Sequence, residues 1–127
     1  MKLLAYQKNN PEWFVKPLID DTSNRLIGIF WMSPEQRQRW IKFYDVIIHD
    51  NTARTNKYNY PLSLFILIDN YNKSRLAAQA IIQDERQESY EWLFRSCLEA
   101  CEIVPLTFVT DSDPAVISTI SVVFPKT

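Results

Sequence analysis

The sequence predicts an α/β fold in which a mixed β-sheet is flanked by helices. The chain has 127 residues, of which 46% are hydrophobic and 23% charged, which is typical of one globular domain. Three short apolar segments, at 46–48, 62–68 and 76–82, are separated by polar turn residues and are typical of strands. Residues 88–101 instead repeat apolar side chains at helical spacing. Strands followed by such a helix indicate an α/β architecture.

The residues before this core predict a strand and a short helix. Residues 25–32 (RLIGIFWM) are rich in β-branched and aromatic side chains, which favour a strand. The next residues, SPEQ at 33–36, form a capping box, with serine as cap and proline at the first helical position. We expect this helix to run to about Tyr44, and residues 1–44 to form an N-terminal arm ahead of a core at 45–127.

The first three strands of the core form a meander. Val46–Ile48 is an apolar run that ends in a His-Asp pair, which is typical of a strand buried on both faces. Residues 62–68 form a longer apolar strand, closed by the turn residues at 69–72. Apolar residues alternate over 76–82, so we expect the third strand to return as the hairpin partner of the second.

Residues 88–101 predict a helix with one apolar side. Its apolar stripe consists of Leu93, Phe94, Cys97, Leu98 and Cys101. Cys97 and Cys101 are four residues apart and lie on one face, where we expect free thiols that serve as small apolar side chains. Free thiols are typical of proteins from a reducing compartment.

The order of the strands follows from their connections. Residues 106–109 form a fourth strand, and Asp113 is the expected cap of a second helix. In a meander the third strand runs parallel to the first. A right-handed crossover through the helix then places the fourth strand parallel to the first and beside it. The predicted sheet order is third, second, first, fourth, so we expect the ends of the first and fourth strands, at Asp50 and Asp111, to be neighbours.

The composition excludes several kinds of site. Gly28 is the only glycine, so no glycine-rich phosphate-binding loop can form. His49 is the only histidine and there are two cysteines, so this chain cannot complete a Cys/His zinc site. With 14 basic and 15 acidic residues the net charge is -1, and no basic surface is expected to bind nucleic acid generically. Carboxylates are therefore the candidates for any chemistry.

No segment is expected to enter a membrane. The apolar part of the first eight residues is too short for a signal peptide. No run of about 18 apolar residues occurs in the sequence. We expect a soluble, intracellular protein without a membrane partner.

Asp50 and Asp111 are the candidate site. Two carboxylates held close together repel each other, which raises the pKa of one of them unless a cation lies between them. Mg²⁺ and Mn²⁺ suit such all-oxygen ligands. Two such ions about 3.5–4 Å apart can activate a nucleophile and stabilise the leaving oxygen in phosphoryl transfer. The pattern does not place the third carboxylate that normally holds the second ion.

The same residues allow other interpretations. An aspartate after a strand often only begins a turn, and Asp113 before a proline is explained as a helix cap. His49 points to the face opposite Asp50 in a regular strand, where we expect a buried, hydrogen-bonded side chain. Arg54 and Lys57 can contact a phosphate backbone, or can be solvated loop charges.

Several linked motifs resemble the Mutator-like (MULE) transposase domain. Residues 45–62, DVIIHDNTARTNKYNYPL, resemble its opening motif of an apolar strand, then D-G-T-aromatic-x-T-N and P-L. Residues 68–70 (IDN) resemble its turn, and residues 88–92 (ESYEW) resemble the start of its helix. Residues 110–115 (TDSDPA), followed by Phe-Pro at 124–125, resemble its second acidic block. The likeness covers the predicted core in consistent order.

This resemblance implies an RNase H-like fold of the DDE/DDD superfamily. It implies that Asp50 and Asp111 are the first two acids of a metal-binding triad, which would bind Mg²⁺ or Mn²⁺ for DNA strand cleavage and transfer in transposition. The expected partner is transposon-end DNA, bound by the full-length protein in the nucleus, and the resemblance also allows an oligomer of that protein. The residues expected to contact DNA are Thr52, Arg54, Asn56 and Lys57.

Two residues depart from the family pattern. Asn51 replaces the usual glycine, and Ala53 replaces the usual aromatic residue. Asparagine tolerates left-handed backbone angles, so the turn can form. The third acid of the family, a glutamate, and the fifth strand would lie beyond the last residue. We therefore expect a fragment truncated before the fifth strand, with little or no turnover alone.

Two other functions remain open at this point. Mutator-related proteins of the far-red-impaired type are similar in fold and act as transcription factors. A non-catalytic, DNA-associated regulatory module is therefore an alternative. An unrelated small α/β interaction domain is a third possibility, and it predicts that Asp50 and Asp111 lie far apart.

Overall fold

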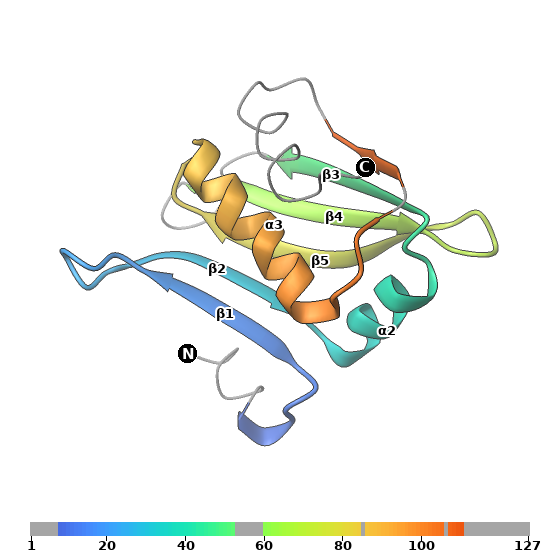
Figure 1. Ribbon diagram of the computed structural model, residues 1–127, viewed down its shortest axis with the longest axis horizontal. Helices are drawn as coiled ribbons and strands as arrows, with labels where there is room; N and C mark the ends of the chain where they lie inside the picture. The colour runs from blue at the N-terminus through green and yellow to red at the C-terminus, as the bar shows by residue number, and fades with distance from the viewer. Residues whose placement is uncertain (1–7, 53–59, 85, 106, 111–127) are drawn as a thin grey trace.

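The computed structural model describes residues 8–52, 60–84, 86–105 and 107–110. Within these ranges the chain forms a six-stranded sheet, and a long helix crosses one of its faces (Figure 1). The strands are β1 (Phe14–Ile19), β2 (Leu26–Met32), β3 (Val46–Thr52), β4 (Leu62–Ile68), β5 (Ser74–Ile82) and β6 (Thr107–Val109). The helices are α2 (Pro34–Lys42) and α3 (Gln87–Cys101).

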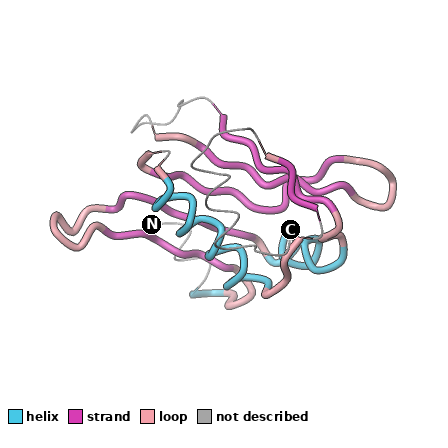
Figure 2. The backbone as a smooth tube through the Cα atoms, turned by 45° about the horizontal axis from the view of Figure 1, so that its top comes forward, coloured by secondary structure: helices cyan, strands magenta, loops and turns pink. Residues whose placement is uncertain are grey.

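The sheet has the strand order β1-β2-β5-β4-β3-β6. All neighbouring strands are antiparallel except β3 and β6, which are parallel. The meander β3-β4-β5 and the crossover through α3 therefore have the connections that the sequence predicts, with β6 beside β3. Figure 2 shows the strands as one twisted layer under α3.

The N-terminal strands extend this sheet, which the sequence did not predict. β2 pairs with β5, for example through Gly28 and Ile82, so the strand of the expected N-terminal arm lies in the same sheet as the strands of the core. β1 then pairs with β2 and forms an edge. Its sequence, FVKPLI, contains Pro17, which argues against a central strand but is tolerated on an edge.

Helix α2 begins at the predicted capping box, which the structure confirms. The Ser33 hydroxyl accepts a hydrogen bond from the Gln36 amide at 3.2 Å, and the Gln36 side-chain oxygen accepts one from the Ser33 amide at 2.9 Å. The buried Gln36 amide group also donates to Gln79 Oε1 of β5 at 2.7 Å. Gln79 Nε2 in turn donates to the Trp31 carbonyl of β2 at 2.8 Å. This network fixes α2 against two strands.

The main core lies between α3 and the sheet. Its largest fully buried side chains are Trp40, Tyr90, Phe30, Phe65, Phe94, Met32, Ile47, Leu67, Ile82 and Leu93. Cys97 and Cys101 are buried free thiols in this core, as predicted. Burial raises the pKa of the Cys101 thiol to about 11 and raises that of Cys97 as well, so both thiols are held protonated.

Strand β3 differs in two ways from the prediction. It continues past Ile48 to Thr52, because Asp50, Asn51 and Thr52 pair with the long strand β4. It is also buried on one face only: Ile47 and His49 are buried towards α3, whereas Ile48 is half-buried and Asp50 is exposed. The expectation of a strand buried on both faces was therefore wrong for these residues.

In the part of the chain that the structure describes, neither helix has the length and apolar character needed to cross a membrane.

Candidate functional site

Asp50 lies within β3, and its side chain is exposed on the face opposite His49. Its backbone position is set by pairing with Leu64 of β4. Asp111, the second predicted acid, lies outside the described residues, so the structure does not test its distance from Asp50. Thr52 is the last residue of β3, and the other expected DNA contacts, at positions 54, 56 and 57, also lie outside the described residues.

The pairing of β3 with β6 brings the strand that carries Asp50 beside the strand that precedes Asp111 in sequence. The parallel register joins Val46 to Thr107, Ile47 to Phe108 and Ile48 to Val109, a constant offset of 61 positions (107 − 46). At the start of this pairing, the Thr107 amide donates to the Asp45 carbonyl at 2.8 Å. Asp50 and Asp111 differ by the same 61 positions in sequence (111 − 50).

His49 has the buried, hydrogen-bonded position predicted for it. Its side chain is 4% exposed, and its Nδ1 atom lies 3.1 Å from the Thr110 hydroxyl oxygen in a hydrogen bond. Thr110 follows the last residue of β6 and precedes Asp111. A side-chain contact between β3 and the residue after β6 therefore occurs one position before each predicted ligand.

Two other aspartates already serve as turn acceptors. Asp69 Oδ1 accepts from the Tyr71 and Lys73 amides at 2.9 and 3.0 Å, and Oδ2 accepts from Arg75 Nε at 3.0 Å. The Lys73 amide, together with Arg75, lowers the pKa of Asp69. Asp20 is similar, since a hydrogen bond from the Ser23 hydroxyl lowers its pKa. These carboxylates shape the β4–β5 and β1–β2 turns.

The described ranges contain no group of three or more His, Cys, Asp and Glu side chains that could hold a metal ion. They therefore offer one of the two predicted ligands, Asp50. Asp50 is paired through the backbone with Leu64 of β4, and its exposed carboxylate is accessible to a hydrated cation.

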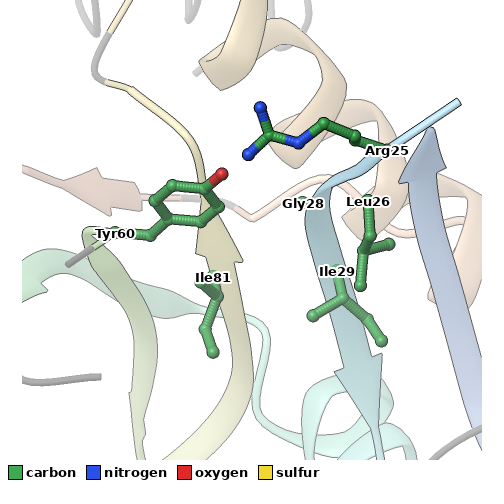
Figure 3. Close-up of a pocket in the computed structure, with 6 residues that line it drawn as sticks. All are labelled: Arg25, Leu26, Gly28, Ile29, Tyr60 and Ile81. Carbon is green, nitrogen blue, oxygen red and sulfur yellow. The ribbon is translucent and has the colours of Figure 1, made fainter. Parts of the chain in front are cut away.

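The structure also contains a cavity that sequence reasoning missed. Its volume is about 310 Å³, and its lining residues are Arg25, Leu26, Gly28, Ile29, Tyr60 and Ile81. Figure 3 shows the Arg25 guanidinium and the Tyr60 hydroxyl above the aliphatic side chains of Ile29 and Ile81. No sequence motif joins these residues, because β2 and β5 become neighbours only in the folded sheet.

Comparison with known proteins identifies the family. Residues 46–127 match the model of the MULE transposase domain. The chain is 30% identical over 122 residues to Protein FAR-RED IMPAIRED RESPONSE 1 of Arabidopsis thaliana, a match that covers 95% of this chain and 15% of that protein. It is 29% identical over 108 residues to Protein FAR1-RELATED SEQUENCE 7 of the same species, covering 84% of this chain and 14% of the relative.

The chain thus spans about one seventh of the length of these two relatives. No solved structure matches it significantly. The family match covers well over half of the residues and includes β3, β4, β5, α3 and β6. This chain therefore belongs to the MULE transposase domain family.

Proposed function

We propose that this chain is part of an RNase H-like transposase core in which Asp50 and Asp111 bind Mg²⁺ or Mn²⁺. The proposed activity is metal-dependent cleavage and transfer of DNA strands in transposition. The observation that carries this proposal is a shared offset in sequence. Residues paired between β3 and β6 are 61 positions apart, and so are Asp50 and Asp111. Parallel strands in register present equivalent side chains on the same face.

The chemistry of the donors supports a hard divalent cation. If the register continues for two positions beyond Ile48 and Val109, Asp111 comes beside Asp50 on the neighbouring strand. Adjacent strands lie about 4.8 Å apart, a spacing at which two carboxylates repel each other strongly without a cation. Carboxylate oxygens are ligands that Mg²⁺ and Mn²⁺ prefer.

A bound ion would activate the nucleophile and stabilise the leaving oxygen of a phosphodiester. The contribution of this chain would be to hold the ligands in place. Asp50 is positioned by the β3–β4 ladder rather than by a loop, so its orientation does not depend on the ligand. The proposed contacts to the DNA backbone are Thr52, at the end of β3, and Arg54, Asn56 and Lys57, which follow it in sequence. Action on DNA further implies a nuclear location.

The relatives favour a second candidate. FAR-RED IMPAIRED RESPONSE 1 and FAR1-RELATED SEQUENCE 7 belong to the far-red-impaired type, whose members resemble transposases and act in transcription. In this second proposal the chain is a transposase-derived, DNA-associated module without catalysis. Metal binding through Asp50 and Asp111 would then be absent.

Titration with Mn²⁺ separates the two candidates. In isothermal titration calorimetry, Mn²⁺ should bind the wild-type chain. Asp50→Asn and Asp111→Asn should each abolish this binding. Asp21→Asn, which removes an exposed carboxylate from the β1–β2 turn, is the matched control and should bind normally. A wild-type chain that binds no Mn²⁺, or whose binding survives both substitutions, would contradict the catalytic proposal and favour the regulatory module.

A further inference from the structure

The single histidine is enclosed by aromatic rings from two neighbouring strands and a helix. The ring of His49 in β3 lies 5.0 Å from that of Phe65 in β4 and 6.2 Å from that of Phe108 in β6. Tyr90 and Phe94 of α3 stand almost perpendicular to it, at 5.9 and 5.3 Å. Because these rings limit the orientations of the imidazole, the direction of its Nδ1 atom is defined by packing.

The hydrogen bond between this ring and Thr110 extends a short strand pairing. β6 has three residues, and three residue pairs define its register with β3. A slip of one residue along β3 would turn every side chain of β6 to the other face. The 3.1 Å contact between His49 Nδ1 and Thr110 Oγ1 lies beyond the last of these pairs and opposes such a slip.

We infer that His49 and Thr110 are positioning residues for the proposed metal site, an inference that rests on the proposed function. They precede Asp50 and Asp111 by one position each. His49 lies on the face opposite Asp50, so it acts on the ligands through the strands rather than by direct contact. Its hydrogen bond would keep β6, the strand that leads to Asp111, in its described register beside the strand that carries Asp50.

Two pairs of substitutions, each compared with the wild-type chain, test this inference. Thr110→Val removes the hydroxyl while conserving shape, whereas Thr110→Ser retains a hydroxyl. His49→Phe keeps a ring among the aromatic side chains but removes the nitrogen, whereas His49→Asn keeps a polar atom close to the position of Nδ1. We expect Thr110→Val and His49→Phe to raise the dissociation constant for Mn²⁺ about tenfold or more, as for other residues that orient metal ligands. Thr110→Ser should bind nearly as wild type, and His49→Asn should recover part of the loss.

Amide hydrogen exchange provides a readout that needs no metal. In the metal-free chain, exchange across residues 107–110 should be faster in Thr110→Val than in Thr110→Ser, because the register of β6 is less firmly held. Ser96→Ala is the control for general destabilisation, since it removes the bond from the buried Ser96 hydroxyl to the Trp92 carbonyl inside α3. It should lower the melting temperature without changing the affinity for Mn²⁺.

The outcomes distinguish this inference from the proposed function. If Asp50→Asn abolishes Mn²⁺ binding but Thr110→Val and His49→Phe bind as tightly as wild type, the positioning role is wrong and the metal site stands. If the wild-type chain binds no Mn²⁺, both are wrong, even if exchange at 107–110 responds to Thr110→Val. If Ser96→Ala lowers the affinity for Mn²⁺ as much as Thr110→Val does, the effect of Thr110→Val reflects general destabilisation, and the inference is wrong.

Discussion

The Arg37 guanidinium donates a hydrogen bond to the Ala100 carbonyl oxygen, 2.9 Å away, and thereby joins α2 to the last turn of α3. Another nitrogen of the same group donates to the Glu12 carbonyl oxygen at 2.8 Å, just before β1. The last carbonyls of a helix have no partner within the helix, so Arg37 supplies one of the missing donors. One side chain therefore connects three segments that are distant in sequence.

We expect Arg37→Ala to lower the free energy of unfolding by about 1–3 kcal/mol, because two carbonyl groups lose a charged donor. Urea denaturation measures this loss. Arg39→Ala is the matched control: Arg39 lies 3.7 Å from the exposed Glu35, and such surface pairs contribute about 1 kcal/mol or less. Equal effects of the two substitutions would show that the link between α2 and α3 is not stabilising.

The buried Gln36–Gln79 pair should be strongly coupled. Gln79→Leu removes the donor to the Trp31 carbonyl and the acceptor of the shortest hydrogen bond from Gln36 Nε2, which should cost about 1–3 kcal/mol in the free energy of unfolding. Gln36→Leu also removes half of the capping box. In the double variant we expect the two losses to be less than additive by about 0.5–3 kcal/mol. Additive losses in chemical denaturation would contradict a shared network.

Gly28 faces α3, and the effect of replacing it on stability should depend on the size of the new side chain. A Cβ atom there would lie 3.4 Å from both the Ile81 carbonyl and Leu18 Cβ and 3.5 Å from the Trp92 ring, which leaves room for one methyl group. Gly28→Ala should raise stability by about 0.4–1 kcal/mol, because it restricts the unfolded chain. Gly28→Val should destabilise by about 1–3 kcal/mol through overpacking against Trp92. Thermal melts that show the same sign for both variants would refute this assignment.

Asp69 should make stability depend on pH in the acid range. Its folded-state pKa is lowered from the usual 3.8, mainly by the Lys73 amide and also by Arg75. Such a group contributes stability that is fully present above its unfolded pKa and is lost as the pH falls through the lower folded pKa. Asp69→Asn removes the charge while keeping an acceptor. The difference in unfolding free energy between wild type and Asp69→Asn should therefore be largest near neutral pH and shrink below about pH 4. A difference that is constant from neutral pH to about pH 2 would contradict the assignment.

Local signals in the sequence were sufficient for several elements. The capping box at Ser33, the apolar strand Leu62–Ile68 and the helix ending at Cys101 all occur where the pattern predicts them. Each depends on neighbours within a few residues, such as a cap, a period or a turn. The burial of His49 also followed from strand alternation, because adjacent side chains in a strand point to opposite faces.

The candidate site was predictable only in part. The sequence singled out Asp50 and Asp111 and the crossover that brings their strands together, and the structure shows β3 and β6 as parallel neighbours. Sequence alone did not reveal that Thr110 contacts His49, because a hydrogen bond between residues 61 positions apart (110 − 49) depends on register. Nor did it predict the cavity between Arg25 and Tyr60, whose walls come from segments that meet only on folding.

By itself, the sequence determined the strands of the meander, the capped helix, the apolar face of α3 and the family motifs, since all of these are encoded by short-range spacing. Only the tertiary structure decided that β1 and β2 extend the sheet, that β3 continues to Thr52 and that Gln36 meets Gln79. The physical reason is that strand pairing and buried hydrogen bonds depend on which segments, distant in sequence, become neighbours in the fold. An edge such as β1, with Pro17 and no alternation, is stabilised by its neighbour rather than by its own sequence.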